Sequence, residues 1–271
     1  MQALRHYLLA VQFFTRIPIT GRLAQWVGYS PAMLRASSAH FPGVGWIAAV
    51  VAMAVYAALA LALAPNPWAP AVAAVGCTVA TVLLTGGFHE DGLADVGDGL
   101  GGSVSAERAI DIMKDSRIGA YGAMALVLAL ASKLALLALL GSHSLGAALA
   151  ALGGAHVFSR LWPLCIVRSL PHVGDTARSK SKPLADQIGN AALAAAFLWC
   201  LVPGVLVGWA QSALFLGAGL LLSALAAARM RGLFARRLGG FTGDCLGATQ
   251  QVGEIAFYLG AALTLGRGGG L

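Results

Sequence analysis

The sequence predicts an all-α polytopic membrane protein with about seven transmembrane helices in hairpins, preceded by a short interfacial or re-entrant helix. Hydrophobic residues make up 58% of the 271 residues and charged residues only 11%, whereas soluble domains carry roughly a quarter charged residues. Apolar stretches also recur from residue 44 almost to the end, with no soluble block between them. We therefore expect a single integral membrane domain over residues 1–271.

Residues 1–43 are expected to form an N-terminal interfacial segment. Its apolar stretch at 7–14, YLLAVQFF, is too short to cross a bilayer, which needs about 20 mostly apolar residues. Arg16 follows closely, and no small-residue cleavage site is present, so a signal peptide is not expected either.

The transmembrane helices are expected in the long gaps between charged residues. Residues 36–88 contain no Asp, Glu, Lys or Arg, and the proline-rich stretch at 64–70 divides them into two spans. The same pattern recurs twice more along the chain, which predicts three helical hairpins. The expected spans are 44–64, 70–87, 120–140, 145–166, 190–208 and 212–229, followed by a last apolar segment at 252–266.

The charged segments all connect these hairpins on one side, whereas the hairpin turns are almost uncharged. They are residues 1–35, 88–118, 168–186 and 229–244. Because Lys and Arg favour the cytoplasmic side, this pattern predicts a multi-pass membrane protein whose four charged segments all face the cytosol. The same placement explains most of the net charge of +7 without nucleic acid as a partner.

Acidic residues gather in one of these segments: seven of the 11 lie between positions 90 and 115. Asp91, Asp95 and Asp98 are spaced four and three apart and would share one face of a helix. Five glycines within 92–102 predict instead that this helix frays and lets the carboxylates gather around a cation or a phosphate. An oxygen-only cluster suits Mg²⁺, with Mn²⁺ as the alternative. A solvated loop with Asp-Gly turns is the simpler interpretation, but the concentration of acids at the bilayer edge favours a site.

The acidic segment, a candidate catalytic loop and helix over 88–118, continues into a predicted amphipathic helix at 105–122 capped by Ser105. The acids on one stripe of that helix, Asp115 among them, would repel one another unless cations compensate. Asp115 and Arg117 therefore either form a salt bridge or contribute metal or phosphate contacts.

Two cations lie deeper in the predicted spans. Lys133 falls near the middle of one span and Arg160 near the end of the next, where charge is costly and usually faces the bundle interior or a wet cavity. Snorkelling to the surface is the alternative for both. Farther along, Asp244 and Glu254 are either ordinary acids at the start of a helix or part of the same polar cavity.

These residues together resemble the cobalamin synthase family, the adenosylcobinamide-GDP ribazoletransferases of late vitamin B12 biosynthesis. The resemblance runs in order along most of the chain and includes LLAVQFFTRIPI, HFPGVGW, GGFHEDGLADVGDGLGG, ERAIDIMKDSRIGAYG and GGFTGDCLGATQQVGE, with the Ser159–Arg160 pair and the in-span Lys133. Glu90 departs from the form in which an apolar residue is common, so we do not expect it to be an essential ligand.

The resemblance implies a phosphoryl transfer at the membrane face. A ribose hydroxyl of α-ribazole or its 5′-phosphate would attack the cobinamide-side phosphorus of adenosylcobinamide-GDP, and GMP would leave. On this basis Asp91 and Asp95 are expected to bind Mg²⁺, with Asp98 as a third ligand or as the general base and His89 as the alternative base. The expected substrate contacts are Asp115, Arg117, Lys133, Arg160 and Asp244.

Two other functions remain as alternatives. A phosphotransferase using CDP-linked alcohol donors would share the first acids, but the continuation expected after them is missing. A secondary transporter or cation channel would use Lys133 and Arg160 as relay or gating groups, with acids near the bilayer midplane at broken helices. Beyond its substrates and the lipid bilayer, the chain could associate with further copies of itself or with a membrane biosynthetic complex.

Overall fold

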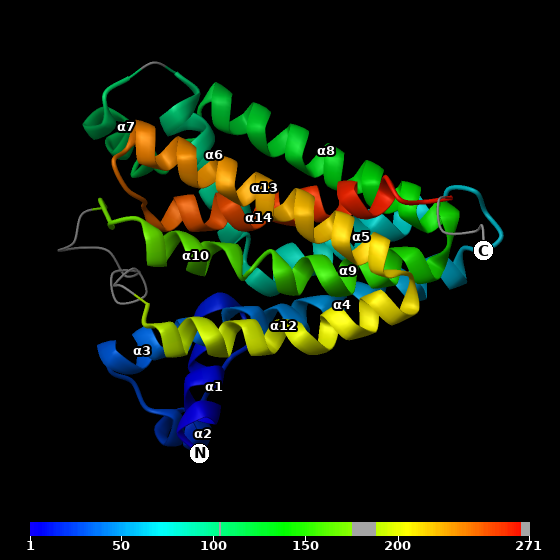
Figure 1. The fold of residues 1–271 in the computed structure, drawn as a ribbon, viewed down its shortest axis with the longest axis horizontal. Coiled ribbons are helices and arrows are strands. Elements are labelled where there is room, and N and C mark those ends of the chain that lie inside the picture. The colour runs from blue at the N-terminus through cyan, green and yellow to red at the C-terminus, as the bar shows by residue number, and fades with distance from the viewer. Residues whose placement is uncertain (103, 175–187, 267–271) are drawn as a thin grey trace.

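The computed structural model describes residues 1–102, 104–174 and 188–266. Every named element in these residues is helical, and the long helices run side by side in one bundle (Figure 1). The all-α prediction is confirmed. The long helices are α4 (Phe41–Ala62), α5 (Ala69–Thr85), α8 (Ala120–His143), α9 (Leu145–Phe158), α12 (Asn190–Ala210), α13 (Ala213–Arg237) and α14 (Gly243–Ala262). The shorter elements are α1 (Gln2–Phe14), α2 (Gly21–Val27), α3 (Pro31–Ser37), the 3₁₀ turn η1 (Ser38–His40), α6 (Phe88–Gly101), α7 (Ala106–Met113) and α10 (Trp162–Ser169).

The predicted hairpins are α4 with α5, α8 with α9 and α12 with α13, and their turns lie at the same end of the bundle (Figure 1). The turns before α9 and α13 are short, because a serine in each turn caps the following helix. Ser144 accepts a hydrogen bond from the Ala147 backbone N–H at 3.0 Å, and Ser212 accepts one from Phe215 at 3.1 Å. Each serine satisfies an N–H that has no partner within its own helix.

Five helical stretches are long and apolar enough to cross a membrane, judged by length and composition. They are Pro31–Ala62, Ala120–His143, Leu145–Ser169, Asn190–Ala210 and Ala213–Arg237. The pair α5 and α6 meets the same test only as one span, bent by 90°. The predicted count of about seven is therefore not confirmed. The predicted apolar segment at 252–266 falls largely within α14. This helix is not one of the five candidate spans, and it carries several polar residues.

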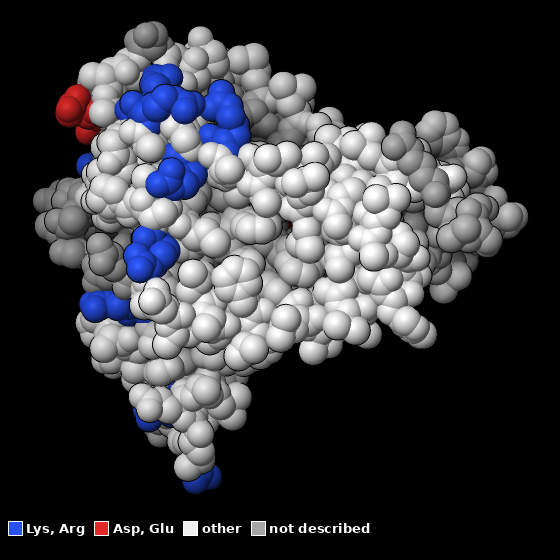
Figure 2. All heavy atoms as spheres, viewed as in Figure 1, with Lys and Arg blue, Asp and Glu red and all other residues white. Residues whose placement is uncertain are grey.

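Charge is distributed on one side of the bundle, as the sequence predicts. Lys and Arg side chains lie over the end that carries α7 and α3, whereas the surface over the rest of the bundle is free of them in this view (Figure 2). We call this the charged end. The predicted charged loop at 168–186 is described only as far as residue 174, and its remaining residues lie outside the described part of the chain.

The N-terminal helices form a small apolar core of their own beside the start of α4. Leu9, Val11 and Phe14 of α1 pack there with Phe41 and Val44 of α4. The elements α3, η1 and α4 follow one another without a break, so the candidate span begins at Pro31; the interfacial location expected for residues 1–43 stays a prediction.

The acidic segment forms a continuous helix, α6, so the prediction that it frays is wrong. Its glycines instead let other elements approach. A Cβ at Gly92 would lie 2.8 Å from the backbone oxygen of Asp244, and one at Gly99 would lie 2.7 Å from the Met113 side chain. Glycine weakens an isolated helix. Here, however, the close packing of α6 against α14 and α7 requires glycine at these positions.

The second half of the acidic motif is shorter than predicted. Ser105 does cap α7, since its hydroxyl accepts the Arg108 backbone N–H at 3.3 Å, but the helix ends at Met113 and α8 begins only at Ala120. Between them the carboxylate of Asp115 accepts the backbone N–H of Arg117 at 3.1 Å. This local turn competes with helix formation, so the predicted helix over 105–122 is divided in two.

Candidate active site

An acidic face lies at the charged end, where α6 meets the start of α14. Asp91 is exposed, Asp95 is half-buried one helical turn farther along, and Asp244 lies in the first turn of α14. We call these three residues the acidic face. The Asp95 carboxylate lies within electrostatic range of both Asp91 and Asp244. In the described part of the chain, no Lys or Arg forms a salt bridge with any of the three.

The chemistry of this donor set fits a hard divalent cation. Among the described residues, no three His, Cys, Asp or Glu side chains are gathered closely enough to hold a metal ion. Mg²⁺, however, is usually bound by only one or two carboxylates and keeps several waters or shares itself with substrate phosphates. Asp91 and Asp95, four residues apart on α6, would supply such carboxylates. The ion would neutralise phosphate charge in any phosphoryl transfer at this face.

Asp98 has a structural role that its spacing did not predict. Its Oδ2 accepts the backbone N–H of Gly119 at 2.7 Å, and its Oδ1 accepts that of Gly122 at 2.8 Å. Both groups belong to the beginning of α8, where the first N–H groups of a helix have no internal partner. Asp98 therefore caps α8 from a neighbouring helix. Its roles as metal ligand or base stay predictions.

His89 lies on the other side of α6 from Asp91, because two residues along a helix correspond to a rotation of about 200°. The His89 side chain is buried and stacks on Phe41 with ring centroids 5.7 Å apart. Among the described residues, its Nε2 has no hydrogen-bond partner. The structure thus separates His89 from the exposed end of the acidic face, and its role as an alternative base stays a prediction.

Asp115 and Arg117 form a salt bridge with each other at the surface. Nη2 of Arg117 lies 2.6 Å from Oδ2 of Asp115, and the Arg117 side chain is 87% exposed. The hydrogen bonds from Arg117 lower the pKa of Asp115 to about 2. The pair lines a cavity of about 390 Å³ that also includes Asp98 and Arg108. The salt-bridge interpretation is confirmed, and substrate contacts by these residues stay predictions.

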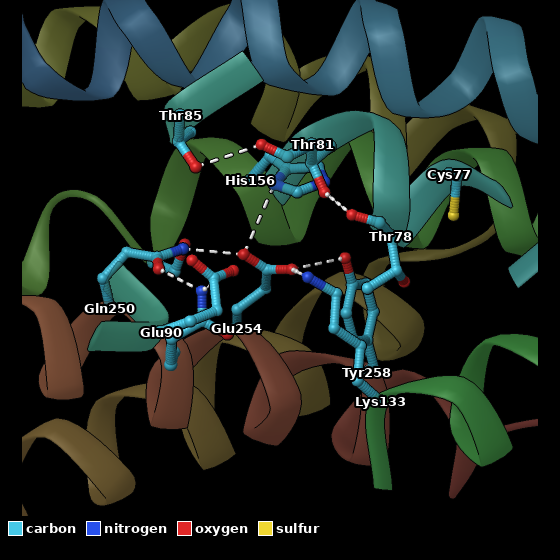
Figure 3. A network of polar contacts seen from close by, with 12 residues as sticks. Cys77, Thr78, Thr81, Thr85, Glu90, Lys133, His156, Gln250, Glu254 and Tyr258 are labelled. Carbon is cyan, nitrogen blue, oxygen red and sulfur yellow. Dashed lines mark hydrogen bonds and ion pairs between the residues drawn. The ribbon is translucent and has the colours of Figure 1, made fainter. Parts of the chain in front are cut away.

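Lys133 and Glu254 form an ion pair in the interior of the bundle (Figure 3). Nζ of Lys133 on α8 lies 2.6 Å from Oε1 of Glu254 on α14, and the two side chains are 2% and 1% exposed. Snorkelling of Lys133 is therefore wrong. Glu254 belongs to the polar interior, which was one of its two sequence interpretations.

Further polar groups surround Glu254 and complete what we call the interior network (Figure 3). Gln250 and Tyr258 donate hydrogen bonds to its two oxygens at 2.6 and 3.1 Å. His156 of α9 places Nδ1 3.3 Å from Oε2. Sequence reasoning missed Gln250, Tyr258 and His156. For Gln250 and Tyr258 the signal was the spacing of four between residues 250, 254 and 258, which places three polar side chains on one face of an apolar helix; no such spacing pointed to His156.

The interior network continues toward α6 and α10. Glu90 accepts a hydrogen bond from Gln251 at 3.0 Å. Arg160 is 2% exposed, donates to the backbone oxygen of His156 at 2.6 Å and lies over the Phe41 ring at 5.7 Å from its centroid. Arg160 does not snorkel either. The predicted polar site is thus two sites: Lys133 pairs with Glu254 and Arg160 lies buried in the interior, whereas Asp91, Asp95 and Asp244 of the acidic face are exposed or only partly buried.

Comparison with known proteins gives the family context of this geometry. A family model described as cobalamin-5-phosphate synthase matches residues 6–262. A protein of Polaromonas sp. (strain JS666) named adenosylcobinamide-GDP ribazoletransferase is 59% identical over 277 residues, covering 97% of this chain and 98% of the relative. Proteins of the same name from Leptothrix cholodnii and Vibrio cholerae (strain O395) are 49% and 40% identical, covering 94% and 93% of this chain and 94% and 91% of the relatives. No solved structure matches the chain.

Proposed function

Because the chain belongs to the cobalamin-5-phosphate synthase family, we propose that it joins adenosylcobinamide-GDP to α-ribazole or its 5′-phosphate. A ribose hydroxyl oxygen of the acceptor forms a bond to the cobinamide-side phosphorus. The bond from that phosphorus to the bridging oxygen of the diphosphate breaks, and GMP leaves. The products are adenosylcobalamin or its 5′-phosphate and one proton from the attacking hydroxyl.

The family match over nearly the whole chain is the observation that carries this proposal. The geometry supports a location for the reaction: the acidic face at the charged end of the bundle. There Asp91 and Asp95 would hold Mg²⁺, which would supply charge neutralisation to the diphosphate. The nearby cavity lined by Arg108 and Arg117 offers guanidinium groups suited to phosphate oxygens.

The functional test uses the purified protein in liposomes. Given adenosylcobinamide-GDP, α-ribazole and Mg²⁺, it should release GMP in proportion to a corrinoid product that contains the ribazole. The same assay is repeated with α-ribazole 5′-phosphate and without any acceptor. If neither acceptor supports GMP release above the acceptor-free control, the synthase proposal fails.

We further propose that the charged end faces the cytosol of a bacterial inner membrane, because Lys and Arg concentrate there. The expected result is that single cysteines at positions 67, in the turn between α4 and α5, and 142, in the last turn of α8, react with an impermeant thiol reagent from outside. A cysteine at position 102 should react only after the cytosolic side is opened. The four native cysteines are first replaced. Labelling of positions 102 and 67 from the same side would contradict the topology.

A further inference from the structure

The exposed face of α13 changes from apolar to basic toward the charged end. Leu221, Leu225 and Arg229 are spaced four apart and therefore share one face of the helix, and Arg236 lies on the same face two turns later. The two leucines are 59% and 56% exposed, and both arginines are exposed. In a membrane-spanning helix such leucines contact acyl chains, so the arginines continue a surface that faces lipid.

These two arginines differ from their neighbours in having no hydrogen-bond or ion-pair partner among the described residues. Arg237 donates to the backbone oxygens of Leu100 and Gly102 at 3.2 and 2.7 Å. Arg231 donates to the hydroxyl of Ser169 at 2.8 Å. Within the described residues, neither Arg229 nor Arg236 makes a hydrogen bond or a salt bridge. Their guanidinium groups are thus free to bind an anion from outside.

The position of the arginines along α13 matches the depth of lipid phosphates. The helix begins at Ala213, and at a rise of 1.5 Å per residue Arg229 lies about 24 Å and Arg236 about 35 Å farther along. The hydrocarbon layer is about 30 Å thick. The two side chains therefore bracket the level at which hydrocarbon gives way to headgroups.

Gly232 makes room between the two arginines on the same face. It lies one helical turn from each, and a Cβ added there would be 3.2 Å from Nη1 of Arg236. The Arg236 guanidinium therefore lies against the bare backbone of Gly232 instead of extending away from the helix. Any side chain at position 232 would occupy this space, which we call the Gly232 notch.

We propose that Arg229, Arg236 and the Gly232 notch bind the phosphodiester of an anionic phospholipid, whose acyl chains lie along Leu221 and Leu225. Guanidinium groups bind phosphate oxygens in a bidentate manner, and basic clusters just beyond a membrane span recognise anionic headgroups. A lipid satisfies both halves of this surface, the apolar stripe and the paired cations, whereas a free phosphate satisfies only the second.

The test titrates the purified full-length protein in detergent with phosphatidylglycerol or phosphatidylcholine and counts bound lipids by native mass spectrometry. The wild type should bind phosphatidylglycerol more tightly. The variant Arg229→Gln/Arg236→Gln should weaken that binding about 30-fold, the loss expected for two cations near an anionic headgroup. Gly232→Leu should also weaken it, although it leaves the charge unchanged.

A matched control separates a site from general charge attraction. Arg22→Gln/Lys114→Gln removes the same charge from exposed side chains elsewhere at the charged end and should retain the wild-type preference. Equal losses in the two double variants, or no loss in Arg229→Gln/Arg236→Gln, would overturn the proposal. Displacement of bound phosphatidylglycerol by millimolar inorganic phosphate would assign the arginines to a phosphate site and would also overturn it. Thermal melting of every variant confirms that each is folded.

Discussion

Replacing Lys133 with Met should destabilise the protein by about 3–5 kcal/mol, because it leaves Glu254 as a buried charge without its closest partner. For a chain of this size, such a loss lowers the melting temperature by about 10 °C. Met keeps the length and apolar character of the lysine stem, so the effect reports the lost charge rather than a cavity. The measurement is a thermal melt of the purified variant in detergent.

The matched controls test whether Glu254 is the reason. The double variant Lys133→Met/Glu254→Gln removes both charges, and the amide can still accept a hydrogen bond from Tyr258, so most of the stability should return. Lys114→Met removes a lysine charge from an exposed position and should change stability by less than about 0.5 kcal/mol. A single Lys133→Met variant that melts like the wild type would show that the ion pair contributes nothing.

The same double variant also tests whether Lys133 contacts substrate. Because Glu254 holds Lys133 in the interior, we expect the stable double variant to keep a KM for adenosylcobinamide-GDP close to that of the wild type. A large rise in KM without a loss of stability would instead support the phosphate contact expected from the sequence.

The hairpins were predictable because a bilayer imposes a strong constraint on sequence. Residues 36–88 had to remain uncharged over two spans, and the break near Pro65 marks their turn. The boundaries of α4 and α5 lie within a few residues of those expected.

No comparable constraint acts on the pairing of Lys133 with Glu254, which are far apart in sequence. The sequence shows opposite charges in two apolar segments but does not indicate that these two residues pair.

The acidic segment shows why local propensity was insufficient. Glycines at positions such as 92 and 99 disfavour an isolated helix, so the sequence suggested a frayed loop. In the fold the same glycines allow α14 and α7 to pack closely on α6, and tertiary packing outweighs the local preference. Likewise, the spacing of Asp98 predicted a shared helix face, but not that a distant helix start would use both of its oxygens.

Substitution of Asp91 or Asp95 with Asn should abolish product formation, with a loss in kcat/KM of at least about 100-fold. Each change keeps shape and hydrogen-bonding capacity but removes the charge that a hard cation needs. Charge stabilisation by a bound metal contributes several kcal/mol in the transition state, and each 1.36 kcal/mol corresponds to a tenfold change in rate. Folding should not suffer, because either change relieves repulsion between carboxylates four residues apart.

Glu90→Gln is the matched control on the same helix. Its side chain turns to the interior, where Gln251 donates to it, and an amide oxygen can accept the same hydrogen bond. This variant should therefore keep substantial turnover.

Asp98→Asn is informative in a different way. Loss of the cap on α8 should lower the free energy of unfolding by about 1 kcal/mol. If the variant also needs a higher Mg²⁺ concentration for activity, Asp98 is a metal ligand as well.

The measurement is a Mg²⁺ titration of GMP release in liposomes for the four variants, after equal membrane insertion is shown. A second readout, independent of activity, is binding of Mn²⁺ followed by its electron paramagnetic resonance signal. Asp91→Asn and Asp95→Asn should lose both the activity and the bound Mn²⁺, whereas Glu90→Gln should keep both. Full activity in either aspartate variant would defeat the metal assignment. Lost activity with unchanged Mn²⁺ binding would show that the carboxylates of the acidic face act on the substrate directly. A carboxylate that binds no metal can still act as a base or orient the attacking hydroxyl.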